Sequence, residues 1–290
     1  MRSRTRMRAW IGATLTGLVA AAAVLVAPAA QAAPPPDVHR SAEKPSADRP
    51  SADRPPAGAP AGAPGTKIVG GRPASEPYPY TSSLQVGGRH GCGASLISDQ
   101  WLVTAAHCVQ GQSRLNVRIG SPNRSSGGTL ATSARLIPHP SYRGLPGSYD
   151  VALVQLSRPV AGTPVAIADA SPAQGSDVRL LGWGQTCPQR GCDQGSEQLK
   201  ELDTRINPDS MCSGGFDPSN ELCVYSTSQA TACYGDSGGP LLVRAGGEWR
   251  LAGATSRAGA NSPTCGGGNS TIYTDVTAHR EWIESTAGLR

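Results

Sequence analysis

Short aliphatic runs recur between residues 94 and 254, and Gly, Pro, Asn and Ser fill the connections between them. Runs of this length bounded by turn formers predict β-strands. Only the C-terminal end has a helical pattern, where Thr277 is in position to cap a helix that carries Trp282 and Ile283. The pattern predicts an all-β fold, either a barrel or a sandwich. The predicted strands are 94–97, 101–104, 115–119, 151–156, 178–181, 240–243 and 249–254.

The chain begins with a pattern typical of a secretory signal. Arginines at positions 2, 4, 6 and 8 precede an apolar run over 10–27, and the sequence AQA at 30–32 matches a small-residue cleavage site. The run is also long enough for a transmembrane anchor. The cleavage site, and the lack of positive charge directly after it, favour removal. We therefore predict a signal peptide at 1–32 and a secreted protein.

The next segment, 33–67, is rich in Pro, Ala and Ser and repeats SADRP at 46–50 and 51–55. It contains almost no large apolar side chain, so it cannot bury enough surface to order itself. We predict a disordered propeptide here; a cell-wall spacer is the alternative. The bias of the sequence toward Ala, Arg and Pro suggests a GC-rich bacterial source.

The formal charge of +5 arises from these two N-terminal segments. Residues 1–67 contain nine Lys and Arg against four Asp and Glu, whereas residues 68–290 contain seventeen of each. The segment 68–290 is long enough to bury a substantial core as one unit. Because it is neutral overall, its composition gives no reason to expect a nucleic acid or a membrane as a partner.

All eight cysteines also lie in the segment 68–290. An even number suits an oxidising compartment and predicts four disulfides, although counting does not decide which cysteines pair. A zinc site is the competing interpretation, and the absence of paired Cys-x-x-Cys spacing disfavours it.

Three short segments contain the residue types of a nucleophilic hydrolase. His107 lies in TAAHC, Asp150 opens DVAL, and Ser237 lies in CYGDSGGP. A serine hydroxyl attacks a carbonyl only if a base removes its proton; imidazole titrates near neutral pH, and a buried carboxylate fixes its tautomer. The order His, Asp, Ser differs from that of subtilisin-like chains and from that of hydrolases with a nucleophile elbow.

Together with IVGG at 68–71 and GWG at 182–184, these segments resemble the chymotrypsin/trypsin family of serine proteases over about residues 68–290. The resemblance implies two antiparallel six-stranded β-barrels with a C-terminal helix, a cleft between the barrels and a join near 161–174. It also implies three disulfides and leaves one further pair of cysteines for the fourth. The implied pairs are Cys92–Cys108, Cys212–Cys223 and Cys233–Cys265, with Cys187 and Cys192 remaining.

The resemblance implies a proteolytic mechanism and a latent precursor. Ser237 attacks a peptide carbonyl while His107 accepts its proton and Asp150 orients the imidazole; an acyl-enzyme follows, and the N–H groups of Gly235 and Ser237 hold the oxyanion. Cleavage after Lys67 would free the α-ammonium of Ile68 to pair with Asp236.

The same resemblance places Thr231 at the floor of the primary specificity pocket, with Ser256, Ala258 and Thr271 around it. A cation in this neutral pocket would be desolvated and unpaired. We therefore expect a preference for small or medium apolar residues, as in elastase, with a chymotrypsin-like preference second and a trypsin-like one disfavoured. Because Lys67 is basic, we expect a separate trypsin-like protease to activate the enzyme, which we expect to be a monomer.

Other residues have no catalytic pattern. Arg257, where the family usually has an aromatic residue, either reaches into the substrate groove or lies on the surface. We interpret His90, His139 and His279 as surface or core residues. The segment 121–129, in the region of the family's calcium loop, has no acidic ligand, and we expect no metal or cofactor.

Two other classes of function remain open. A secreted binding module could keep the fold without the chemistry, although all three triad residues are present. An esterase could use the same triad.

Overall fold

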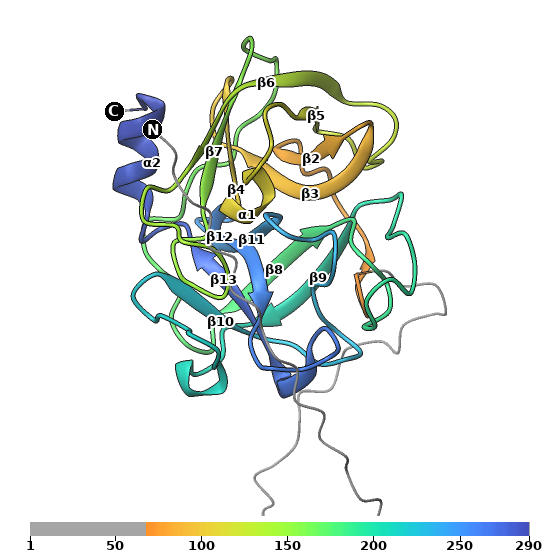
Figure 1. The fold of residues 1–290 in the computed structure, drawn as a ribbon, viewed down its shortest axis with the longest axis vertical. Helices are drawn as coiled ribbons and strands as arrows, with labels where there is room; N and C mark the ends of the chain where they lie inside the picture. The colour runs from red at the N-terminus through yellow and green to blue at the C-terminus, as the bar shows by residue number, and fades with distance from the viewer. Residues whose placement is uncertain (1–67, 290) are drawn as a thin grey trace, which may run out of the picture. The chain divides into compact units, whose positions relative to one another are not determined.

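The computed structural model describes residues 68–289, and the predicted signal peptide and propeptide lie outside them. The described strands form two antiparallel sheets, labelled in Figure 1. The first sheet is a closed barrel with the strand order β2-β3-β4-β7-β6-β5, because β2 pairs with both β3 and β5. Its strands are β2 (Thr81–Val86), β3 (Arg89–Leu96), β4 (Trp101–Thr104), β5 (Asn116–Ile119), β6 (Thr129–Pro138) and β7 (Ala152–Leu156).

The second sheet has seven strands in the order β1-β9-β8-β11-β12-β13-β10. It differs from the predicted six-stranded barrel because the short β1 is added at one edge. At the other end, Ile206 and Val224 form an isolated bridge that brings the end of β9 to β10, so the sheet curls toward closure. Its strands are β1 (Arg72–Pro73), β8 (Asp177–Gly182), β9 (Lys200–Arg205), β10 (Glu221–Tyr225), β11 (Pro240–Ala245), β12 (Glu248–Ala258) and β13 (Ser270–Asp275).

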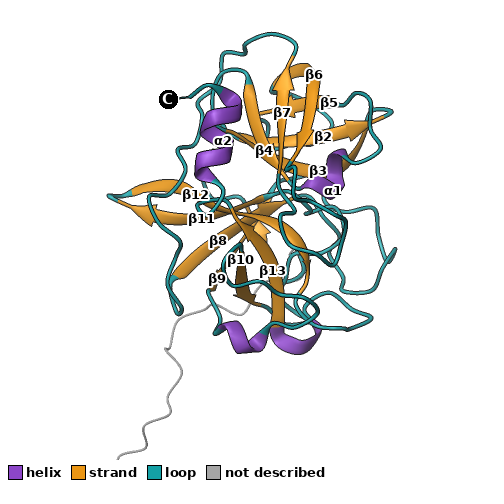
Figure 2. Cartoon of the chain, turned by 60° about the vertical axis from the view of Figure 1, so that its left-hand side comes forward, coloured by secondary structure: helices purple, strands orange, loops and turns teal. Residues whose placement is uncertain are grey.

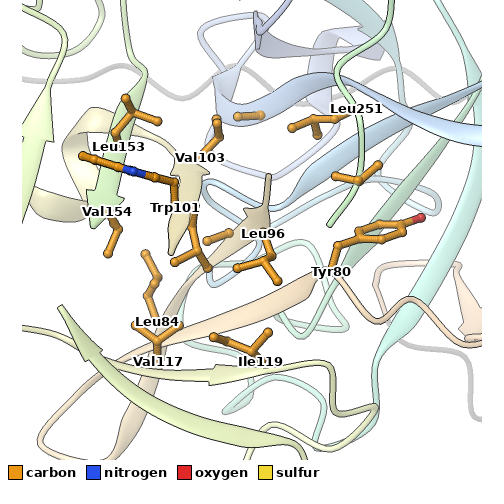
Figure 3. Close-up of a cluster of buried hydrophobic side chains, with 14 of the residues drawn as sticks. Tyr80, Leu84, Leu96, Trp101, Val103, Val117, Ile119, Leu153, Val154 and Leu251 are labelled. Carbon is orange, nitrogen blue, oxygen red and sulfur yellow. The ribbon is translucent and has the colours of Figure 1, made fainter. Parts of the chain in front are cut away.

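Aliphatic side chains fill the interiors of both sheets, as a chain with a single Phe requires. Figure 3 shows part of the first cluster, in which Leu84, Leu96 and Val117 are gathered inside the barrel. A second cluster, which includes Leu180 and Leu241, fills the other sheet. The segment between β7 and β8 links the two sheets and contains the predicted join at 161–174.

All seven predicted runs overlap strands, but six further strands were not predicted: β1, β2, β6, β9, β10 and β13. β13 contains Ser270, Thr271 and Thr274, which are buried and bonded inside the protein instead of facing water. Alternation of apolar and polar residues is therefore absent from this strand, which is paired on both sides, with β12 and β10.

The helices are short. α2 (Arg280–Ala287) is the predicted C-terminal helix, and its Ile283 is buried in the first cluster, beside the first barrel (Figure 2). The predicted cap is wrong: α2 begins after His279, and Thr277 donates to the carboxylate of Asp275. Within residues 68–289 no helix is both long and apolar enough to cross a bilayer. The other helical segments are α1 (Ala106–Val109), η1 (Asp209–Met211) and η2 (Gly267–Asn269).

Candidate active site

His107 and Asp150 meet at one end of the first barrel. α1 follows β4 directly and contains His107, and the neighbouring Cys108 is disulfide-bonded to Cys92 on β3. The backbone N–H of His107 donates to Asp150 Oδ1 at 2.9 Å, and its Nδ1 lies 2.7 Å from Asp150 Oδ2. A carboxylate only accepts, so Nδ1 carries the proton and leaves Nε2 of the neutral ring as an acceptor.

Asp150 is fully buried and is also held by two strands of the second sheet. Ser256 on β12 donates its hydroxyl to Asp150 Oδ2 at 2.7 Å, and Thr274 on β13 donates to the Asp150 carbonyl at 2.8 Å. Burial opposes ionisation of this carboxyl, but the hydrogen bonds from His107 and Ser256 outweigh it and hold its pKa below the ordinary value. Asp150 is therefore an ionised group that orients the imidazole.

Ser237 lies on a loop of the second sheet that is pinned against the first. Its carbonyl accepts the N–H of Gly93, on β3, at 2.7 Å. Gly238 has a positive φ of 71°, and a Cβ there would collide with the hydroxyl of Thr104. Only Gly allows this approach. The loop thus lies against the end of β4, just before His107, although residues 68–289 contain no hydrogen bond between the Ser237 hydroxyl and the His107 ring.

Two backbone donors accompany Ser237. Gly235 has a positive φ of 97°, and among the described residues neither its N–H nor that of Ser237 has an acceptor. His90 holds the Gly235 peptide in place. Its Nε2 lies 2.8 Å from the Gly235 carbonyl, and its Nδ1 lies 2.9 Å from the Ser83 hydroxyl. Burial lowers the pKa of His90 to about 4, so the ring is neutral. His90 is a residue of this site that sequence reasoning assigned no role.

Asp236 is buried directly beside these donors. Its Oδ1 accepts the N–H of Gly184 at 2.7 Å, and its Oδ2 accepts that of Cys233 at 2.9 Å. Burial raises the pKa of Asp236 to about 7, and the two hydrogen bonds offset only part of that effect. No cationic side chain of the described part of the chain contacts this carboxyl. Ile68, the predicted partner, is also buried and shares an apolar cluster with Ala232.

A cavity of about 110 Å³ opens beside Ser237. Three predicted pocket residues, Ser256, Ala258 and Thr271, line it. Thr231 does not; it is fully buried, and its hydroxyl lies 3.1 Å from that of Thr271. Thr231, the predicted floor residue, therefore meets the cavity only through its contact with Thr271. The cavity ends in hydroxyl groups that are bonded to one another, and its lining residues include no anion.

Arg257 borders the cavity beside Ser237, and the alternative prediction of an exposed surface residue is wrong. Its side chain is only 9% exposed and forms an ion pair with Glu221, a residue that has no signal in the sequence. The disulfides are the three implied pairs, Cys92–Cys108, Cys212–Cys223 and Cys233–Cys265, together with the remaining pair, Cys187–Cys192.

Comparisons with known proteins agree with this geometry. A family model described as Trypsin matches residues 68–283. Transmembrane protease serine 11G of Rattus norvegicus is 35% identical, over 77% of this chain and 56% of its own length. Trypsin alpha of Drosophila erecta is 34% identical, over 76% of this chain and 88% of its own.

The solved structure of neuropsin, a serine protease of mouse brain, superposes with a TM-score of 0.66 at 29% identity and covers 75% of this chain and 98% of that one. This chain spans about half the length of the transmembrane protease relatives that it matches. These relatives are animal proteins, so a bacterial source stays a prediction. The chain belongs to the trypsin family of serine proteases.

Proposed function

We propose that this protein is a secreted serine endopeptidase that acts on proteins or peptides through an acyl-enzyme. The observation that carries this proposal is the buried Asp150 carboxylate, which holds both the backbone and the imidazole of His107. The Ser237 loop lies against the same segment. These three groups are a nucleophile, a base and a group that orients the base.

The proposed reaction follows from these atoms. Nε2 of His107 accepts the proton of the Ser237 hydroxyl as the oxygen attacks the carbonyl, and the imidazolium then returns the proton to the leaving amine. The free N–H groups of Gly235 and Ser237 stabilise the oxyanion. Catalytic hydrogen bonds are often long in proteins without substrate, and we expect the serine–imidazole bond to form in the complex.

We propose that the chain is made as a zymogen and is cleaved between Lys67 and Ile68 by a trypsin-like protease. The support is the Asp236 carboxyl, which is buried without a cation in the described part of the chain. A new α-ammonium on Ile68 would supply that charge and stabilise the segment that carries the oxyanion donors.

We propose small or medium apolar residues before the cleaved bond. The support is a narrow cavity whose lining includes Ala232, Ala258 and several hydroxyl groups, with no anion that would pair a Lys or Arg side chain. A chymotrypsin-like preference for aromatic residues is the second candidate, because the cavity adjoins open space at its mouth.

The test uses the full chain, processed after Lys67, with peptide and ester substrates and a phosphonate that labels reactive serines. We expect peptide cleavage and labelling of Ser237, and Ser237→Ala is expected to lower kcat about 10⁶-fold. Ester cleavage alone would favour an esterase, and absence of both activities and of labelling would favour a binding module. A peptide library would then report the residue before the cleaved bond.

A further inference from the structure

Arg257 and Glu221 form an ion pair that is almost closed to water. Two guanidinium nitrogens bind the two carboxylate oxygens: Nη1 contacts Oε1, and Nη2 lies 3.0 Å from Oε2. The Glu221 side chain is fully buried, and Oε2 also accepts the N–H of Asp217 at 2.9 Å. A two-point contact of this kind fixes the guanidinium plane as well as its distance.

This pair lies next to an irregular place in β12. The β12–β13 register shifts between Thr255 and Arg257, so that Ser256 is the extra residue of a β-bulge. A bulge re-aims a side chain, and the sheet ladder does not hold the extra residue as it holds its neighbours. Ser256 points its hydroxyl at Asp150 from this bulge. The Arg257 anchor therefore holds the chain directly after the residue that supports the acid.

The same guanidinium also contacts a second loop. Nη2 of Arg257 donates to the Gly215 carbonyl at 3.2 Å, within the loop that the Cys212–Cys223 disulfide closes. A Cβ on Gly215 would lie 3.3 Å from the carbonyl oxygen of Pro146, in the segment that leads to Asp150. The ion pair thus holds the chain after Ser256 and contacts a loop that lies close to the segment before Asp150.

We propose that Arg257 and Glu221 are positioning residues for Asp150. The ion pair fixes the strand after the bulge, aims Ser256 at the carboxylate and supports the loop beside the segment that precedes the acid. Arg257 also borders the cavity beside Ser237, so the pair sets one wall of that cavity. This inference rests on the proposed peptidase function.

The test compares Arg257→Met, Glu221→Gln and the double variant R257M/E221M in the processed full chain. Arg179→Met is the matched control: Arg179 is 12% exposed and binds Asp203 with two nitrogens, but it touches no residue of the site. Each single variant at the pair is expected to lower kcat about 10²-fold, the usual effect of misplacing a catalytic group by about 1 Å. The control is expected to change thermal stability and leave kcat unchanged.

Two further readouts separate positioning from simple stabilisation. The double variant removes the unpaired charge, so it should regain the thermal stability that either single variant loses, yet keep the low kcat. The proton NMR signal of the His107 Nδ1–H, which reports its bond to Asp150, should shift in the pair variants and not in the control. This signal can be recorded in the Ser237→Ala protein, whatever the turnover.

The inference is overturned if the double variant recovers kcat together with stability, or if the pair variants match Arg179→Met in kcat and leave the NMR signal unmoved. A wild-type protein that neither cleaves peptides nor labels at Ser237 would instead refute the proposed function; the NMR comparison would still decide whether the ion pair positions the His107–Asp150 contact.

Discussion

Asp150 and Asp236 are both buried carboxylates beside the same loop, but their surroundings differ. Asp150 is bonded by the imidazole and backbone of His107 and by the Ser256 hydroxyl, and these bonds hold its pKa low in spite of burial. Asp236 has only two backbone donors, and burial raises its pKa to about 7. The Asp150 carboxylate is therefore stabilised by donors that are already in place, whereas burial favours the protonated, neutral form of the Asp236 carboxyl.

This contrast indicates which part of the proposed site is complete before processing. The residues that hold His107, the proposed base, are already in place, whereas the loop with the proposed oxyanion donors contains a carboxyl without a positive partner among residues 68–289. Processing is therefore expected to complete the Asp236 region and to leave the Asp150 region as it is.

Replacing Asp150 with Asn should nearly abolish turnover. The amide no longer selects the imidazole tautomer with a proton on Nδ1, and kcat is expected to fall about 10⁴-fold. Steady-state kinetics of the processed protein measure this. Asp169→Asn is the control, because that carboxylate is 98% exposed and its ion-pair partner is Arg280, which is not a residue of the candidate site. A loss smaller than tenfold in D150N would mean that His107 is oriented by other groups.

The intact chain should become less stable as the pH rises, and Asp236 should be the cause. Its folded pKa of about 7 lies above the ordinary value of 3.8, so the folded state binds the proton more tightly than the unfolded state. The stabilisation is present below pH 3.8 and is lost as the pH rises toward about 7, by at most roughly 4 kcal/mol.

Chemical denaturation of the intact chain between these pH values measures the effect, with Asp236→Asn as the reference that lacks it. In the processed chain the Ile68 ammonium should favour the ionised Asp236 carboxyl. The stability relative to Asp236→Asn should then rise with pH instead of falling. Equal pH dependence in the intact and processed chains would contradict the pairing of Ile68 with Asp236.

Acid should destabilise the protein through His279. This ring is 4% exposed and lies 5.1 Å from His139 and 5.5 Å from Tyr149, which precedes Asp150. Burial, with a smaller contribution from His139, lowers its pKa from 6.5 to about 4. The unfolded state then binds the proton more tightly, so stability is present above pH 6.5 and is lost as the pH falls toward 4, by about 3 kcal/mol.

Thermal unfolding of His279→Phe against the wild type tests this, because the apolar ring cannot be protonated. The difference between the two proteins should grow in favour of the variant as the pH falls. A constant difference between pH 7 and pH 4 would show that His279 does not titrate in this range.

The sequence predicted the residues of the proposed reaction better than it predicted the residues that hold them in place. His107, Asp150 and Ser237 stand in short segments whose composition fits their proposed roles, and the aliphatic strands could be predicted because their signal is also local in the sequence. Glu221 could not be linked to Arg257, because the two are 36 residues apart and meet only when β10 and β12 lie in one sheet. Strand β13 was missed because its polar side chains bond to distant segments, a pairing that periodicity does not reveal.

The smallest expected effect is that of Ser256→Ala, which removes one donor from Asp150 and leaves His107 bound. Hydrogen bonds to a charged group contribute about 1.5 to 3 kcal/mol, so we expect kcat to fall by roughly 10- to 100-fold. The pKa of Asp150 should rise, because one of the bonds that lowers it is lost. The acid limb of the kcat profile against pH and the turnover of the processed variant measure both effects.

Thr255→Val is a suitable neighbour control, since its hydroxyl donates to the Gly239 carbonyl and not to Asp150. If S256A and T255V lose turnover equally, the second sheet supports the acid through its backbone and not through this hydroxyl.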